Sequence, residues 1–239
     1  MWDHLLLAWQ IAIEQAWIAY CAGSLPIGAA IALPGGEIVA EGRNRIYDTA
    51  EDGNPQHFRQ HFMAHAEQNA FISLGILKRE RPEFKRSLAD CVLYTTLEPC
   101  DMCVGTLIQS GLKSVHFLVP DPMGGAIDSL TATPHVRQKH ITVQGPQPGI
   151  AANIVLAIFT VSIVQSGITM PEEIVSLLSP YSDGLKLGDI LAKSHELEQF
   201  RANQMPISSV YNLLADQLRI LKNADTPIES NDRSNSSDS

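Results

Sequence analysis

The sequence has little cysteine, little basic charge and no long apolar run, and each shortage excludes a class of protein. Four cysteines in 239 residues are too few for a disulfide scaffold. The longest apolar stretch, residues 154–164, is too short to cross a bilayer. Lys and Arg number 17 against 26 Asp and Glu, and the formal net charge of −9 removes a general attraction to phosphate backbones. We therefore expect a soluble protein whose default partner is not long nucleic acid.

The first residues also lack the pattern of a secretory signal. Asp3 precedes the leucines at 5–7, where a signal peptide would be basic, and Glu14 interrupts the apolar run. Two of the cysteines, Cys21 and Cys91, lie in apolar segments and are expected to be inert buried thiols. These features together indicate a reducing, cytoplasmic compartment.

The length suits one domain of ordinary size with an appendage. Strand-type and helix-type patterns alternate over residues 1–168, which form the expected main domain. Residues 223–239 contain one large apolar side chain, Ile228, among Ser, Asn and Asp, which predicts a disordered acidic tail. Between them, a C-terminal helical extension is expected over 169–222, with helix-type spacing over 172–179, 187–200 and 208–222.

Apolar periodicity predicts the order of elements in the main domain. A helix over 2–22, capped by Asp3, leads into a hairpin of strands 27–33 and 37–43. Residues 150–165 are apolar all round, which leaves a buried helix and a strand both open. The alternation predicts an α/β fold with parallel neighbours. The other expected elements are a loop over 46–62, helices over 65–77 and 99–110, and strands over 91–95, 114–119 and 141–144.

Two short motifs carry the chemistry. In the first, His65 stands two residues before the carboxylate of Glu67; in the second, Pro99 is followed by Cys100 and Cys103. Imidazole and thiolate are the ligands that zinc prefers, and three protein ligands leave a fourth position for water. The two cysteines share one face at the start of their helix, where the helix dipole lowers the pKa of a thiol. Together the motifs form the signature of zinc deaminases.

Glu67 is not needed as a ligand and is therefore available to carry protons. A carboxylate beside a metal-activated water can take its proton and pass it to a ring nitrogen and then to a leaving amine. Residues two apart do not face each other in a regular helix, so His65 must occupy the irregular turn before the helix. The pattern predicts zinc-dependent hydrolytic deamination of an amino-substituted nitrogen heterocycle, with release of ammonia.

The alternative from the same residues is a structural zinc site. Such a site needs a fourth protein ligand, and His61, one helical turn before His65, is available. The spare carboxylate of Glu67 and the open coordination position would then have no explanation. His57 and His61 are expected in the loop or at the rim of the pocket, with contact to substrate and plain solvation both left open.

The chain resembles the cytidine and deoxycytidylate deaminase superfamily, in the branch of tRNA adenosine deaminases, guanine deaminases and related nucleobase or nucleoside deaminases. The resemblance covers roughly residues 5–165 and implies a three-layer α/β/α fold with a five-stranded mixed sheet. It implies that His65, Cys100 and Cys103 bind zinc and that Glu67 shuttles protons. It rests on Pro26-Ile27-Gly28-Ala29, Gly42-Arg43-Asn44-Arg45, Ala64-His65-Ala66-Glu67, Thr96-Leu97-Glu98-Pro99-Cys100-Asp101-Met102-Cys103-Val104-Gly105 and Gly124-Gly125-Ala126.

The same resemblance implies two substrate-binding residues and an assembly. Asn44 would hydrogen-bond the base, for which an amide with both donors and acceptors is suited. Ala66, between the histidine and the glutamate of the first motif, is the second expected contact. Members of the family are commonly dimers, so a homodimer is expected.

Departures from the family pattern fall where substrate is selected. His61-Phe62-Met63 stands where many relatives have Asp-Pro-x, and the loop over 46–62 is longer than in the tRNA enzymes. The basic C-terminal helix of those enzymes is not found. The expected substrate is thus a small nucleobase, nucleoside or related heterocycle.

Two further functions stay open. A tRNA adenosine-to-inosine deaminase needs a basic groove, which here only residues 78–86 with Arg43 and Arg45 offer. A non-catalytic interaction protein with the deaminase fold would be marked by loss of Glu67 or of a ligand, and all of these are present.

Overall fold

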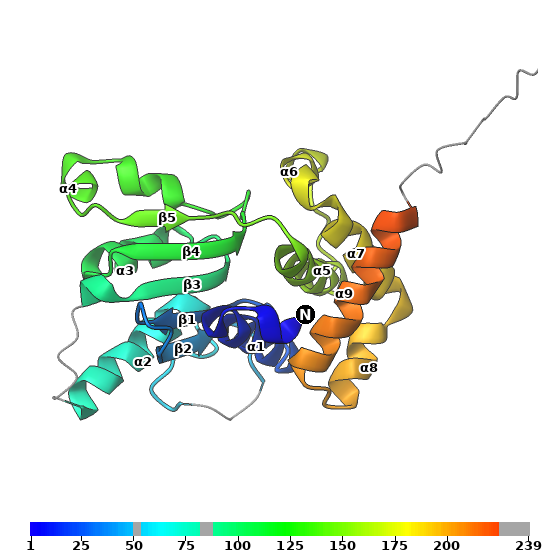
Figure 1. The fold of residues 1–239 in the computed structure, drawn as a ribbon, viewed down its shortest axis with the longest axis horizontal. Coiled ribbons are helices and arrows are strands. Elements are labelled where there is room, and N and C mark those ends of the chain that lie inside the picture. The colour runs from blue at the N-terminus through cyan, green and yellow to red at the C-terminus, as the bar shows by residue number, and fades with distance from the viewer. Residues whose placement is uncertain (50–53, 82–87, 225–239) are drawn as a thin grey trace, which may run out of the picture.

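A five-stranded mixed sheet organises the computed structural model, which describes residues 1–49, 54–81 and 88–224 (Figure 1). The strand order is β2-β1-β3-β4-β5. β1 pairs antiparallel with β2 and β3, whereas β3, β4 and β5 run parallel. The predicted α/β fold with a five-stranded mixed sheet is confirmed. The strands are β1 (Gly28–Ala32), β2 (Ile38–Arg43), β3 (Val92–Leu97), β4 (Ser114–Val119) and β5 (Thr142–Gln144).

The turn of the β1–β2 hairpin is made by Pro34, Gly35 and Gly36. Gly36 donates its N–H to the carbonyl of Leu33 at 2.8 Å and has a φ of 86°, a left-handed conformation that glycine adopts without strain. The parallel pair β3–β4 is joined through α3 (Asp101–Ser110), as parallel strands require a crossover connection. The sequence predicted both connections.

Helix α1 (Leu7–Cys21) begins later than predicted, because a separate 3-10 turn, η1 (Trp2–His4), precedes it. Asp3 lies in η1 and makes no cap for α1, so the capping prediction was wrong. The cause is tertiary, since the buried ring of Trp2 packs edge-on against that of Tyr211 with centroids 5.3 Å apart. A contact with a distant helix thus overrides the local pattern.

Helices cover both faces of the sheet (Figure 1). One face packs on α2 (Ala66–Glu80) and α3, and the other on α1 and α5 (Ile150–Gln165). Alternation along β1 shows how the strand serves both layers, because Ile31 enters the α2 side of the core and Ala30 the α1 side. Both side chains are completely buried.

The open alternative for residues 150–165 is resolved, since this segment is the helix α5. It is apolar all round because protein covers it on both sides, with the sheet on one side and α7 (Ser182–Ser194) on the other. The α5–α7 contact is close, for a Cβ added at Gly188 would lie 2.5 Å from the Cβ of Thr160. Gly184 donates its N–H to the Asn153 Oδ1 at 2.7 Å.

The C-terminal extension therefore forms a further helical layer on α1 and α5, at the side of the molecule away from α2 and α3 (Figure 1). The helix expected over 187–200 is broken, because His195 has a φ of 55° and separates α7 from α8 (Glu196–Ala202). Side chains of α7, α8 and α9 (Ile207–Ala224) enter the same core as those of α1 and α5. The remaining helices of the described residues are η2 (Leu88–Asp90), η3 (Ile127–Thr131), α4 (Pro134–Arg137), α6 (Glu172–Leu177) and η4 (Ser179–Tyr181).

Some predictions fall on residues that the structure does not describe. The tail expected over 223–239 lies outside the described residues from 225 onward, and so does most of the basic segment over 78–86. Within the described ranges, no helix combines the length and the apolar character that a membrane crossing requires.

Candidate metal and catalytic site

The two sequence motifs meet at the N-termini of two neighbouring helices. His65 is the N-cap residue of α2, with a φ of −74° and a ψ of 155°, and Cys100 is the N-cap residue of α3. Cys103 lies in the first turn of α3. His65 is thus in the irregular turn before its helix, where the spacing to Glu67 requires it to be.

The side chains of His65, Cys100 and Cys103 form one ligand group. Their donor atoms lie within 4.8 Å of one another, and the Nδ1 of His65 is 3.6 Å from the Cys100 Sγ and 3.7 Å from the Cys103 Sγ. A tetrahedral zinc ion, with Zn–S bonds of about 2.3 Å and Zn–N bonds of about 2.0 Å, requires an N···S separation of about 3.5 Å. The donor set and the spacing both fit zinc.

The ligand group has three protein members in the part of the chain that the structure describes, and His61 is not one of them. The Nδ1 of His61 accepts the N–H of Met63 at 3.1 Å, within its own turn. A closed structural site with His61 as fourth ligand is therefore not supported. Three ligands with one position open is the arrangement of catalytic zinc sites.

The two thiols have opposite proton affinities in the metal-free protein. A hydrogen bond from the Cys103 thiol lowers the pKa of Cys100 to about 3, and His65 adds to this effect. The same hydrogen bond, together with burial, raises the pKa of Cys103. The Cys100 thiol therefore loses its proton more readily than the Cys103 thiol, and both must be deprotonated to bind a divalent cation.

Glu67 is almost completely buried beside this group, with 4% of its surface exposed. Its Oε2 lies 3.5 Å from the Cys103 Sγ, and its Oε1 lies 3.2 Å from the hydroxyl of Thr95. Burial raises the pKa of the Glu67 carboxyl above its ordinary value. A buried carboxyl with a raised pKa, next to a metal-type ligand group, is suited to accept and return a proton.

Asn44 and Ala66, the two expected substrate contacts, lie near the N-terminus of α2. The backbones of β2 and α2 meet closely, because a Cβ at Gly42 would be 2.3 Å from the carbonyl oxygen of Ala66. This contact places the residue after β2, Asn44, beside the first turn of the helix. The Oδ1 of Asn44 accepts hydrogen bonds from the Ser24 hydroxyl at 2.7 Å and from the Ile46 N–H at 3.1 Å. The amide oxygen thus holds the turn that follows β2.

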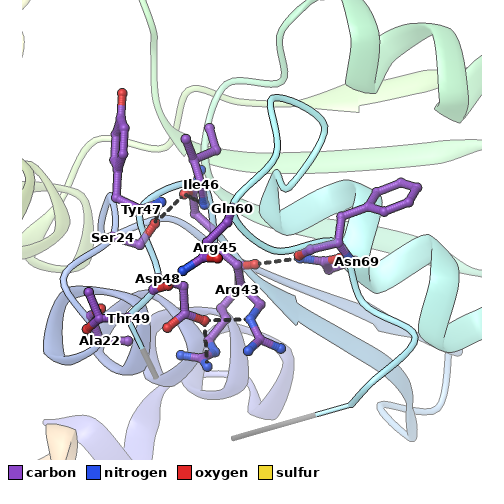
Figure 2. A network of polar contacts seen from close by, with 12 residues as sticks. Ala22, Ser24, Arg43, Arg45, Ile46, Tyr47, Asp48, Thr49, Gln60 and Asn69 are labelled. Carbon is purple, nitrogen blue, oxygen red and sulfur yellow. Dashed lines mark hydrogen bonds and ion pairs between the residues drawn. The ribbon is translucent and has the colours of Figure 1, made fainter. Parts of the chain in front are cut away.

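Arg43 and Arg45, which sequence analysis offered for a basic groove, are buried. Figure 2 shows both guanidinium groups pointing toward Asp48. The Oδ2 of Asp48 is 2.9 Å from an Arg43 nitrogen and 2.5 Å from the Arg45 Nε. Only 5% of Arg43 and 2% of Arg45 is exposed, so neither is a surface cation, although both line a cavity with Glu41 and His57.

Asn69 is a buried residue at this site that sequence analysis did not identify. Its Nδ2 donates to the carbonyls of Arg43 and Phe58, each at 3.1 Å, and its Oδ1 accepts the N–H of Phe58 at 2.8 Å. His57 is held nearby, with its Nε2 2.7 Å from the Ser73 Oγ. Burial lowers the pKa of His57 to about 4, with help from Arg45, so its ring is neutral at pH 7. These contacts fasten the described part of the 46–62 loop to β2 and α2.

The loop after β4 is fixed to the cysteine motif by Glu98, whose role sequence analysis also did not identify. The carboxylate of Glu98 accepts the N–H groups of Asp121 and Ile127, each at 3.2 Å. Gly125 forms an isolated bridge with Cys100. A Cβ at Gly125 would lie 2.5 Å from the carboxyl carbon of Glu98, so the loop reaches the ligand Cys100 only with glycine at this position.

The other two cysteines differ in burial. Cys91 is completely buried, as expected, whereas Cys21 is partly exposed, so the prediction of a buried thiol is wrong for Cys21. Burial raises the pKa of Cys21 to about 11 and also raises the pKa of Cys91. Both are therefore protonated and unreactive at neutral pH.

Comparison with known proteins agrees with this site. The model of the cytidine and deoxycytidylate deaminase zinc-binding region matches residues 3–119. A tRNA-specific adenosine deaminase of Aquifex aeolicus is 31% identical over 121 residues, which cover 51% of this chain and 70% of that protein. A cytosine deaminase of Candida albicans is 30% identical over 107 residues, which cover 44% of this chain and 60% of that protein.

Among solved structures, a guanine deaminase from Bacillus subtilis is 30% identical, with 47% of this chain and 62% of that chain covered and a TM-score of 0.36. The chain spans less than two thirds of the length of several curated relatives, 60% for the Candida protein. From the family match and the Aquifex relative, the chain belongs to the cytidine and deoxycytidylate deaminase family.

Proposed function

We propose that this protein is a zinc-dependent hydrolase that removes the amino group of a small nucleobase, nucleoside or related heterocycle as ammonia. The observation that carries the proposal is the buried carboxyl of Glu67, 3.5 Å from a sulfur of a three-ligand group with zinc-type spacing. A structural site would give this carboxyl no chemical role, although its burial disfavours the charged form.

His65, Cys100 and Cys103 would hold the metal. When bound in such a site, zinc lowers the pKa of a water ligand and so supplies a nucleophile near neutral pH. Glu67 accepts the proton of the attacking water and donates it to a ring nitrogen of the substrate. In a second transfer the same carboxyl takes the remaining proton of that water, from the new hydroxyl group, and gives it to the amine. The carbonyl forms as the C–N bond breaks and ammonia leaves.

The buried setting of Glu67 supports both transfers. Because burial raises the pKa of the Glu67 carboxyl, its protonated form is closer in energy to the carboxylate than it would be in water. The Thr95 hydroxyl, 3.2 Å from the Oε1 of Glu67, limits the rotation of the carboxyl. Asn44 and Ala66, at the adjoining end of β2 and start of α2, are the proposed contacts to the heterocycle.

Charge favours a small substrate over a long nucleic acid. The chain carries a formal net charge of −9. Arg43 and Arg45 are buried on Asp48, which removes two of the cations that a tRNA-binding groove would need. Phe62, in the segment that departs from the family pattern, is 89% exposed, and an apolar surface residue adds nothing to phosphate binding.

The second candidate is deamination of adenosine in tRNA. Relatives named tRNA-specific adenosine deaminases favour it, including the Aquifex protein and one from Bacillus subtilis that is 34% identical over 123 residues. It predicts activity on an anticodon stem-loop that falls steeply as salt is raised, since phosphate contacts release counterions.

Ammonia release from a panel of substrates separates the two candidates. The panel contains guanine, adenine, cytosine, their nucleosides and a tRNA anticodon stem-loop, each incubated with the zinc-loaded protein. We expect release from at least one free base or nucleoside and a rate on it that changes little with salt. Release from the stem-loop alone would favour the tRNA function, and no release from any compound would contradict both.

A further inference from the structure

Gln68 connects the two helices that carry the metal ligands. It follows Glu67 in the first turn of α2, and 6% of its surface is exposed. Its Nε2 lies 2.8 Å from the Thr106 Oγ1 and 3.3 Å from the carbonyl oxygen of Met102, both in α3. The same nitrogen lies 3.8 Å from the Sγ of Cys103.

The nitrogen that contacts the sulfur is held from two sides. The Thr106 hydroxyl also lies 3.2 Å from the Oε1 of Gln68, so both ends of the amide are engaged with α3. A side-chain amide nitrogen has two hydrogens and no lone pair to offer, so it meets the sulfur of Cys103 as a donor. With one hydrogen on the Thr106 Oγ1, the other is shared between the Met102 carbonyl oxygen and the Cys103 sulfur. Because sulfur is larger than oxygen, such N–H···S contacts are longer than bonds to oxygen.

We propose that Gln68 is a positioning residue for the zinc site, which donates a hydrogen bond to the Cys103 thiolate and aligns the cysteine helix with the histidine helix. The inference rests on the proposed function only in that a zinc ion occupies the ligand group. A donor to a ligand sulfur fixes its orientation and stabilises its negative charge, and loss of such outer contacts typically weakens metal binding about 10–100-fold.

The test replaces the donor and, separately, the anchor of the donor. Gln68→Met keeps the length of the side chain but has no N–H, whereas Thr106→Val removes the anchoring hydroxyl and keeps the donor to the sulfur. Zinc affinity is measured by competition with a chromophoric chelator. The sulfur-to-metal charge-transfer band of the Co²⁺-substituted protein is recorded in parallel.

We expect Gln68→Met to weaken zinc binding about 10–100-fold. We also expect it to move the charge-transfer band to longer wavelength, because a thiolate without its hydrogen bond gives up charge more easily. Thr106→Val should leave the band in place and weaken binding much less. An unmoved band in Gln68→Met, or equal losses in both variants, would overturn the inference, since either result assigns Gln68 to helix packing alone.

A measurement on the unaltered chain covers the case in which Gln68→Met does not fold. In protein loaded with ¹¹³Cd, a side-chain amide proton of Gln68 should show scalar coupling to the metal through the sulfur. Absence of this coupling would overturn the inference. If the wild-type chain binds zinc and shows these signatures but releases no ammonia, the proposed function fails and the assignment of Gln68 stands.

Discussion

Replacing Glu67 with Gln is expected to lower ammonia release by about 10²–10⁴-fold while the protein keeps about one zinc per chain. The amide has nearly the shape of the carboxyl, so it fits the same buried space, but it cannot accept or return a proton. The substitution also removes a buried carboxyl whose pKa is raised by desolvation, so we expect no loss of stability. The rate is measured on the best substrate of the panel, and zinc is measured by elemental analysis.

Glu98→Gln is the matched control, because Glu98 is also a carboxylate beside the cysteine motif. Its oxygens accept two N–H groups of the loop after β4, and an amide oxygen retains one of these bonds. We expect this variant to keep most of the activity. If Glu67→Gln retained more than a tenth of the wild-type rate at full zinc content, the proton-transfer role of Glu67 would be wrong.

Truncation of Leu191 to Ala is expected to lower the free energy of unfolding by about 2–5 kcal/mol. Leu191 lies in α7, is completely buried, and belongs to the core that α1 and α5 share with the C-terminal extension. The control is Ile220→Ala in α9, where 67% of the side chain is exposed and the expected change is within about 0.5 kcal/mol. Both are measured by urea denaturation.

The shape of the unfolding curve tests the same arrangement. If the extension over 169–222 is a layer of one core, the wild-type chain unfolds in one transition and Leu191→Ala shifts that transition as a whole. A separate first transition that alone responds to Leu191→Ala would show that the extension is an independent unit. The boundary at 168 predicted from the sequence would then be a domain boundary.

The ligand group was predictable because the constraint is local and chemical. Cys100 and Cys103 are three residues apart, and the two-residue spacing of His65 and Glu67 works only with the histidine before the helix, which is where the structure has it. The contacts of Gln68 and Asn69 were not predictable. A single amide in a helix pattern does not indicate its partner, since the partners lie in elements distant along the chain.

The sequence did not predict that the C-terminal extension packs on α1 and α5. α5 is apolar on all sides, and α1 buries Trp9 and Trp17 as well as the residues that face the sheet. A helix that is apolar all round needs cover on both faces, and for α5 that cover is the C-terminal extension, which also packs on α1. The late start of α1 also reflects packing on the extension, because the ring of Trp2 contacts that of Tyr211 in α9.

The surroundings of the ligand group are the least predictable part of the site. Burial of Arg43 and Arg45 on Asp48 could not be read from the sequence, in which the two arginines look like surface cations. The structure brings Asn44 and Ala66 to the start of α2, but their contact with substrate stays a prediction. The homodimer also stays a prediction.

X-ray absorption at the zinc edge of the purified, metal-loaded protein tests the central claim most directly. The claim is that His65, Cys100 and Cys103 hold one zinc ion and leave one position open. The account predicts two sulfur neighbours at about 2.3 Å and two nitrogen or oxygen neighbours at about 2.0 Å, one of them exchangeable for an added anion. A third sulfur neighbour, or a first shell without sulfur, would contradict it.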